Sequence, residues 1–176
     1  MTLIEVQPKT VPVAAAIRRA MEFPDDLRAW FAAEDVLVLA LAAVGEVDPA
    51  RFGARGDFGR DPRCSAPMLC TLLTYCYALG RYASEEIEGA VGHDPVLRYL
   101  CAHQYPTWQV LRRFRRVHRP LLSACLARLI RRTWTEHGLI PPALDGADDL
   151  MAMRAVGVAE ELLERAVLAD MMAADV

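Results

Sequence analysis

The sequence predicts an all-α protein that folds as a compact multi-helix bundle, and three observations support this prediction. Apolar residues make up 54% of the 176 residues and charged residues 24%, which is typical of a globular chain. Capping residues and prolines recur where successive apolar segments begin, as at the starts of helices. No segment alternates strictly between apolar and polar residues, so strands are not expected beyond a few residues near 139–146.

The predicted helices follow one another along the chain. They cover residues 11–22, 23–44, 66–80, 84–92, 94–103, 106–118, 120–138 and 147–176, with a short turn at 48–52. Segment 66–80 has almost no polar surface and ends on a glycine, so we expect it to be the enclosed central helix.

Four of these helices have predicted N-terminal caps. Asp25 or Asp26 would cap the second helix, and Ser84, Asp94 and Thr107 would cap the three helices that precede residue 119. In each case a side-chain oxygen can accept a hydrogen bond from a backbone N–H that the first turn leaves unpaired.

Composition also excludes several classes of protein. The longest apolar run, 36–44, is too short to cross a bilayer, and the chain does not open like a signal peptide, so we expect a cytoplasmic protein. The cysteines are odd in number and form no CxxC pair, which predicts buried thiols in a reducing compartment. We expect no metal site and no cofactor.

The charge of the chain is strongly uneven. Between Asp94 and Glu136 the sequence contains nine arginines and no acidic residue, so this segment carries +9. The rest of the chain therefore carries −12, because the whole chain carries −3. A block of this kind indicates a binding surface for a polyanion, and arginine is suited to forked contacts with phosphates and base edges.

The centre of this block is the predicted helix at 107–119. On a helical wheel its apolar residues (Val110, Leu111, Phe114 and Val117) lie on one side, and Gln109, Arg112, Arg116 and Arg119 lie on the other, flanked by Arg113 and Arg115. Arginines four residues apart repel each other by about a few tenths of a kcal/mol. The pattern favours an external polyanion, while the competing interpretation assigns the counter-charge to Glu85, Glu86, Glu88 or the acidic tail.

Three short helices in succession (84–92, 95–103 and 107–118) are typical of a helix-turn-helix unit, in which the last helix enters the major groove. Its first residues would read bases, since Gln can pair with adenine and Arg with guanine, and later arginines would hold phosphates. The predicted nucleic-acid-binding residues are Thr107, Gln109, Arg112, Arg113, Arg115, Arg116 and Arg119.

Residues 28 to 140 resemble the N-terminal helical domain of InsH-type bacterial insertion-sequence transposases. The matching positions are Asp61, Pro62, Leu72, Leu73, Tyr75, Tyr77, Gly80, Arg81, Ser84, Ile87, Glu88, Tyr99, Leu100, Pro106, Phe114, Arg115, Arg116 and His118. The resemblance implies a module that recognises transposon ends. In this family it precedes a catalytic core with three metal-binding carboxylates.

The resemblance also bears on catalysis. Asp145 falls where the family has its first catalytic aspartate, but about 30 residues follow it, without the second and third carboxylates that a two-metal site needs. The chain also has no nucleophile motif and no glycine-rich phosphate loop. We therefore expect a protein that is not an enzyme.

Taken together, the sequence predicts a transposase-derived, nucleoid-associated protein that binds double-stranded DNA through residues 107–118. Residues 1–140 would form the DNA-binding domain, and residues 141–176 a linker and an acidic amphipathic helix. One side of that helix, with Val156, Ala159, Leu163 and Val167, could form a homodimer, dock on a protein partner or pack on its own domain. The alternative function is a helical adaptor whose arginine face binds an acidic protein or RNA.

Overall fold

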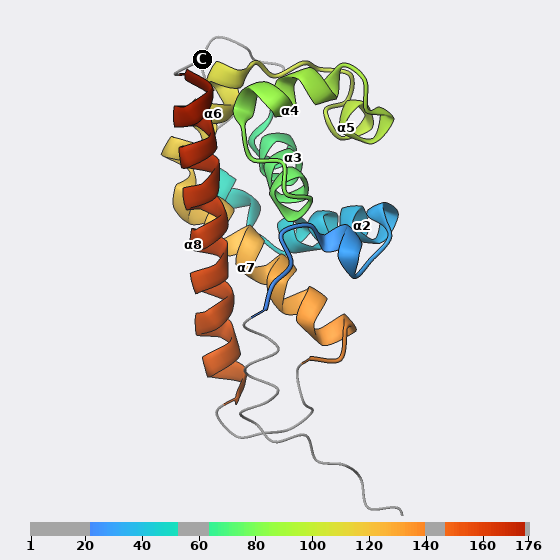
Figure 1. The fold of residues 1–176 in the computed structure, drawn as a ribbon, viewed down its shortest axis with the longest axis vertical. Coiled ribbons are helices and arrows are strands. Elements are labelled where there is room, and N and C mark those ends of the chain that lie inside the picture. The colour runs from blue at the N-terminus through green and yellow to red at the C-terminus, as the bar shows by residue number, and fades with distance from the viewer. Residues whose placement is uncertain (1–21, 53–63, 140–146, 175–176) are drawn as a thin grey trace, which may run out of the picture.

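The computed structural model describes residues 22–52, 64–139 and 147–174, and within these ranges the protein is all-helical, as predicted (Figure 1). Two short 3-10 helices, η1 and η2, comprise Leu27–Ala29 and Pro49–Phe52. The α-helices are α2 (Ala33–Gly45), α3 (Ala66–Ala78), α4 (Ser84–Val91), α5 (Pro95–Leu100), α6 (Trp108–Val117), α7 (Arg119–Glu136) and α8 (Ala147–Ala174). The predicted helix at 11–22 and the domain boundary at residue 140 fall almost entirely outside the described residues, as do Asp61, Pro62 and Asp145.

The helix predicted at 23–44 is shorter than expected. Asp26 accepts a hydrogen bond from the backbone N–H of Arg28 and binds the guanidinium of the same residue. This local closure makes the 3-10 helix η1, and the chain then runs through extended Ala32 before α2 begins at Ala33. Asp26 is thus a cap, as predicted, but of η1 and not of α2.

Helix α3 is the enclosed central helix that the sequence predicts. Eleven of its residues are buried, and Ser65 accepts a hydrogen bond from the N–H of Met68 at its start. The chain leaves the helix through Gly80, whose φ is +73°. A Cβ at Gly80 would lie 2.7 Å from the carbonyl oxygen of Asp25, so glycine is needed both for the left-handed turn and for this close approach.

The next two helices differ in how they begin. Asp94 caps α5 as predicted, because its carboxylate accepts hydrogen bonds from the N–H groups of Val96 and Leu97. The cap position of α4 is Ala83 and not Ser84, so that prediction is wrong. Ser84 is bound instead by Asp170 of α8, which accepts hydrogen bonds from its N–H at 2.7 Å and from its hydroxyl at 2.9 Å.

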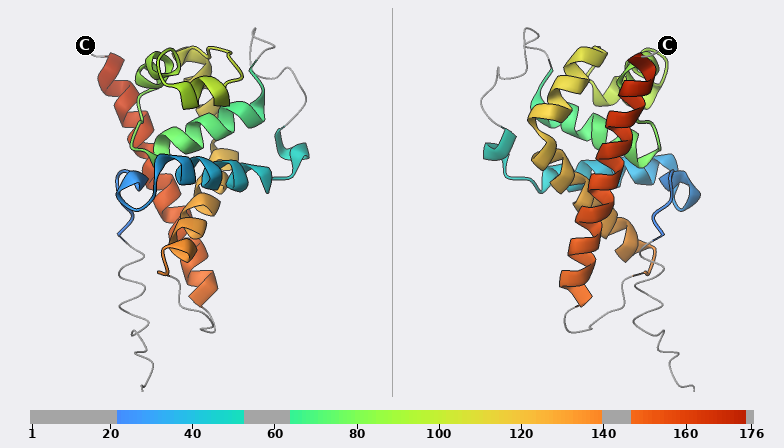
Figure 2. Two further views of the ribbon diagram at one scale, coloured as in Figure 1. Left: turned by 90° about the vertical axis from the view of Figure 1, so that its right-hand side faces the viewer. Right: turned by 60° about the vertical axis from the view of Figure 1, so that its left-hand side comes forward.

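The last helix is an integral part of the bundle. Helices α6 and α7 meet at His118, and α8 runs along α7 on the near side of the right-hand view in Figure 2. Ala159 and Leu163 of α8 are buried in the same core cluster as α3 and α7. Of the three roles considered for this helix, the structure therefore shows packing on its own domain. No helix of the described ranges has the length and apolar character needed to cross a membrane.

Replacement of Gly80 by alanine should lower the free energy of unfolding by at least about 2 kcal/mol, since alanine must adopt the left-handed region and move the Asp25 carbonyl. Gly89 provides the matched control, because it is helical and a Cβ added there would meet nothing within 4 Å. Gly89→Ala should leave stability unchanged or raise it by up to about 1 kcal/mol. Urea denaturation of both variants tests this, and equal midpoints would contradict it.

Candidate nucleic-acid interface on helix α6

Helix α6 is rotated relative to the predicted orientation. Leu111 and Phe114 are buried as expected, but Arg115 is also buried, with 6% of its surface exposed. Val117, which was expected in the core, is 54% exposed. The expected outward position of Arg115 is therefore wrong. The rotation follows from α8, which places the carboxylate of Asp170 on the inner side of α6.

Arg115 is held by groups from three other helices. One terminal nitrogen donates a hydrogen bond to the hydroxyl of Tyr77 on α3 at 3.0 Å, and the other binds the carboxylate of Asp170 on α8. Ser84, at the start of α4, donates to the same carboxylate. Removal of a charge from water costs several kcal/mol unless a counter-charge and further hydrogen bonds meet it, and this network supplies both. Arg115 therefore stabilises the fold and is not available to a ligand.

The pKa values of these groups reflect the network. Burial raises the pKa of Asp170, but the hydrogen bonds from Ser84 and Arg115 outweigh this effect and hold it below its ordinary value of 3.8. Burial lowers the pKa of Arg115, but Tyr77 and Asp170 reverse this, so the guanidinium stays protonated. Burial raises the pKa of Tyr77 to about 12, against the opposing effect of Arg115.

Arg112 is engaged on the same side of α8. Its Nε lies 3.1 Å from the carboxylate of Asp170, close enough for an ion pair but without the alignment of a hydrogen bond. A terminal nitrogen donates to the carbonyl of Asp170 at 2.9 Å and lies 3.6 Å from Glu85. The guanidinium also covers the ring of Trp108, 4.4 Å from its centroid. Arg112 is thus largely satisfied within the protein.

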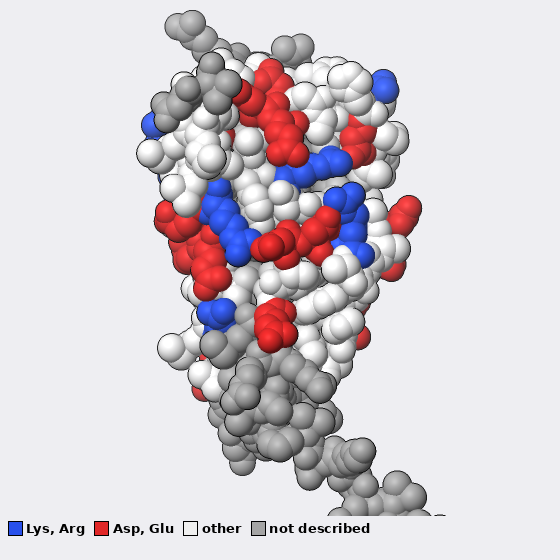
Figure 3. All heavy atoms as spheres, in the orientation of Figure 1, with Lys and Arg blue, Asp and Glu red and all other residues white. Residues whose placement is uncertain are grey.

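Other arginines of the basic segment also have internal partners. Arg119 binds Glu160 at 2.8 Å and Glu164 at 2.5 Å, both on α8. Arg131 and Arg132 of α7 are paired with Asp148 and Glu46. Figure 3 shows one face of the molecule, on which basic and acidic side chains lie interspersed and no continuous basic surface is seen.

These contacts decide between the two interpretations of the charge block. Five of the nine arginines (Arg112, Arg115, Arg119, Arg131 and Arg132) form ion pairs with carboxylates of the same chain. For them the expectation that only an external polyanion supplies the counter-charge is wrong. The competing interpretation is confirmed for Arg112 with Glu85 and for Arg115, Arg119 and Arg131 with the acidic tail, whereas Arg132 pairs with Glu46 at the end of α2.

A carboxylate from another helix, Glu88 of α4, lies at the N-terminal end of α6. Thr107 occupies the cap position, as predicted, but its side chain makes no capping hydrogen bond. Glu88 of α4 takes over this role and accepts a hydrogen bond from the N–H of Trp108 at 3.0 Å. A negative charge at this end stabilises the helix dipole and opposes the approach of phosphates to Thr107.

An open strip remains on the outer side of α6, formed by Gln109, Arg113 and Arg116. The spacing of these residues, four and then three positions, places them on one side of the helix, and all three are exposed. Within the described part of the chain, neither Arg113 nor Arg116 has a carboxylate partner. The strip is therefore the part of the predicted site that an external anion can reach without breaking an ion pair.

A groove of about 490 Å³ lies beside this strip, between α6 and the C-terminal half of α8. Arg116 and Arg119 contribute to its basic side, and Val167, Met171 and Ala174 line the opposite side. Met171 is 60% exposed. The sequence alone does not indicate this groove, because it depends on how α8 packs against α6.

The helix-turn-helix arrangement stays a prediction. Helices α4, α5 and α6 follow one another as expected, but residues 101–107 separate α5 from α6, and Ala102 and His103 both adopt a positive φ in this connection. No protein-family model, curated protein or solved structure matches the chain. The resemblance to transposase N-terminal domains therefore rests on the sequence motifs.

Replacement of Asp170 by alanine should lower the free energy of unfolding by about 3–5 kcal/mol, because it leaves the buried guanidinium of Arg115 without a counter-charge. Asp148 provides a control, since its pair with Arg131 is at the surface and its side chain is 79% exposed. Asp148→Ala should cost less than about 1 kcal/mol. Urea denaturation distinguishes the two, and similar losses would mean that the buried pair has no special role.

The same carboxylate should make stability depend on pH. Because the pKa of Asp170 is lower in the folded than in the unfolded state, its contribution is complete above about pH 4 and is lost as the pH falls through the folded pKa. The difference in urea midpoint between the wild type and Asp170→Asn should therefore shrink as the pH falls below about 4. Asp26 and Glu160 also have lowered pKa values and so also make stability depend on pH. Their contribution is the same in both proteins and cancels when the midpoint of the variant is subtracted from that of the wild type. A constant difference would refute this assignment.

Proposed function

We propose that this protein is a non-catalytic, transposase-derived DNA-binding protein that contacts duplex DNA through the open strip of α6. The observation that carries the proposal is the pair of exposed arginines, Arg113 and Arg116, which lie on the same side of the helix and have no carboxylate partner among the described residues. The sequence motifs that resemble transposase N-terminal domains support the same class of function.

The chemistry of the strip suits a nucleic acid. Gln109 offers an amide that can pair with the edge of adenine, and an arginine can hold a phosphate or pair with guanine. Binding through Arg113 and Arg116 leaves the internal ion pairs intact. Arg112 and Arg119 would take part only by exchanging a carboxylate of the protein for a phosphate. Arg115 is excluded from the interface by its burial.

The charges around α6 also indicate how a duplex would lie. Glu88 lies at the N-terminal end of the helix and Glu85 lies 3.6 Å from Arg112, and both carboxylates repel phosphates. Contact is therefore expected along the open strip of Gln109, Arg113 and Arg116 and not at Thr107. This narrows the predicted site from seven residues to Gln109, Arg113 and Arg116.

The number of free arginines sets the expected salt dependence. Two phosphate contacts give a slope of about −2 in a plot of log binding constant against log salt, which is roughly a tenfold loss between 50 and 200 mM. All five arginines of the predicted site would give a slope of about −4.5 and a loss of several hundredfold. The salt slope thus measures how many arginines contact the duplex.

Titration of a fluorescent duplex by anisotropy tests the proposal. The wild type should bind with the shallow slope, and the variant with Arg113→Gln and Arg116→Gln should bind at least about tenfold more weakly at 50 mM salt, since it lacks both phosphate contacts. Arg165→Gln, which removes an exposed arginine of α8 that is paired with Asp25, serves as the control and should leave binding unchanged. Absence of binding by the wild type, or equal binding by the double variant, would exclude this function.

A second candidate is a helical adaptor that binds an acidic protein segment, and the groove beside the strip favours it. A basic side with Arg116 and an apolar side with Met171 together fit an acidic amphipathic helix. The two candidates differ in one result. For an adaptor, Arg116→Glu would abolish a protein complex while the DNA titration of the wild type stayed flat.

A further inference from the structure

Two cysteines from different helices lie in contact in the core. Cys70 of α3 and Cys125 of α7 are both fully buried, and their sulfur atoms are 3.4 Å apart. A disulfide requires about 2.0 Å between the sulfurs. The remaining approach is about 1.4 Å, a displacement that side-chain rotation and small shifts of α3 and α7 can supply.

The two thiols are not equivalent. The thiol of Cys70 donates a hydrogen bond to the sulfur of Cys125, which raises the pKa of Cys70 and lowers that of Cys125. At Cys125, burial acts in the opposite direction and raises the pKa, whereas the positive charges of Arg128 and Arg51 lower it further. Cys125 is therefore the sulfur that more readily becomes a thiolate, the reactive form of the side chain.

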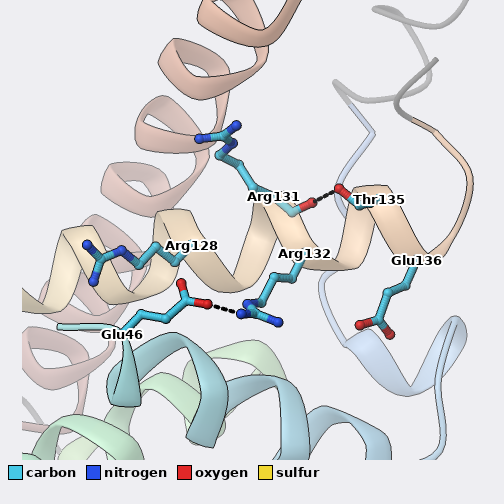
Figure 4. A pocket seen from close by; sticks show the side chains of 6 residues that line it. All are labelled: Glu46, Arg128, Arg131, Arg132, Thr135 and Glu136. Atoms are coloured by element: carbon cyan, nitrogen blue, oxygen red, sulfur yellow. Dashed lines mark hydrogen bonds and ion pairs between the residues drawn. The ribbon is translucent and has the colours of Figure 1, made fainter. Parts of the chain in front are cut away.

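Of the two arginines whose charges lower the pKa of Cys125, Arg128 has the larger effect. It follows Cys125 by three residues on α7, so the two side chains leave the helix on the same side. One terminal nitrogen of Arg128 is buried and has no hydrogen-bond partner among the described residues. Figure 4 shows that Glu46, the nearby carboxylate, is bound to Arg132. A thiolate at Cys125 would provide a counter-charge for this guanidinium.

We propose that Cys70 and Cys125 are an oxidisable dithiol, which a hydroperoxide converts into a disulfide that joins α3 to α7. The thiolate of Cys125 attacks one peroxide oxygen, the O–O bond breaks, and the leaving oxygen departs as water or an alcohol after taking up a proton. Cys125 is then a sulfenic acid. The sulfur of Cys70 displaces its hydroxyl as water, with loss of the Cys70 proton. Two thiols are oxidised, and one peroxide is reduced.

The other cysteines provide a contrast within the same chain. Burial raises the pKa of Cys76, and it raises the pKa of Cys101 to about 11. Both are free thiols that stay protonated at neutral pH. Among the described residues, no adjacent hydrogen-bond donor lowers the pKa of either thiol in the way that Cys70 lowers the pKa of Cys125.

The cross-link would have a structural effect. It closes a loop from residue 70 to residue 125 that contains α4, α5 and α6, and so restrains the unfolded chain. The oxidised protein should therefore resist urea better than the reduced protein. In a reducing compartment such a bond forms transiently, under oxidising conditions, as in proteins that sense oxidants.

The protein of residues 1–176 can be treated with hydrogen peroxide, alkylated and analysed by mass spectrometry without reduction. We expect a loss of two hydrogen atoms and a cross-linked peptide that contains Cys70 and Cys125. The cross-link should persist in Cys76→Ser and disappear in Cys70→Ser and in Cys125→Ser. Arg128→Gln should slow its formation by on the order of threefold to tenfold, because it removes a charge that favours the thiolate. Arg131 lies about one turn further along α7 and is paired with Asp148. Arg131→Gln should therefore leave the rate of cross-link formation unchanged.

Circular dichroism before oxidation establishes that each variant is folded, and the wild-type result decides the matter without any variant. A folded wild-type protein that gains oxygen atoms without a cross-link, or does not react, overturns the proposal. A disulfide that joins other cysteines, or one that survives Cys70→Ser, also overturns it. Equal rates in Arg128→Gln and Arg131→Gln would overturn the role of Arg128.

Discussion

The buried ion pair between Arg115 and Asp170 is the interaction on which the arrangement of the helices depends. It lies where α3, α4, α6 and α8 meet, and each of these helices contributes a group: Tyr77, Ser84, Arg115 or Asp170. A buried guanidinium is stable only if its counter-charge and hydrogen bonds are in place. The pair therefore determines the rotation of α6 and the position of the end of α8 at the same time.

Pairing with internal counter-charges also explains how an acidic protein contains a segment with a net charge of +9. Carboxylates of α8 approach the arginines of α6 and α7, with Glu160 and Glu164 at Arg119 and Asp148 at Arg131. Most of the arginines that suggest a binding surface in the sequence are thus neutralised by carboxylates of the same chain. The proposed contact with DNA is confined to the strip that α8 does not cover, and its affinity is expected to be modest for that reason. Arg128 illustrates the other outcome. One of its terminal nitrogens is buried without a hydrogen-bond partner among the described residues, and its charge lowers the pKa of the Cys125 thiol.

Local signals predicted the elements well where the cause is itself local. Proline with a preceding aspartate begins α5, and Gly80 ends the central helix, because capping and left-handed turns involve residues within one turn of each other. Prediction failed where a distant group intervenes. Ser84 has the sequence of a cap, but Asp170 binds it from 86 positions away. The helical wheel placed Arg115 at the edge of the outer face, because apolarity alone identifies the core side and takes no account of a buried counter-ion.

The sequence by itself determined the all-helical class, the enclosed α3, the order of the helices and the existence of a basic segment, because these follow from residue type and short-range spacing. Only the tertiary structure decided which arginines are free. Charge neutralisation depends on distances between helices, and α8, which follows the basic segment in the chain, brings its carboxylates to it by packing on α7. The proximity of Cys70 and Cys125 has the same origin, since 55 positions separate them and only the packing of α3 on α7 brings their sulfurs together.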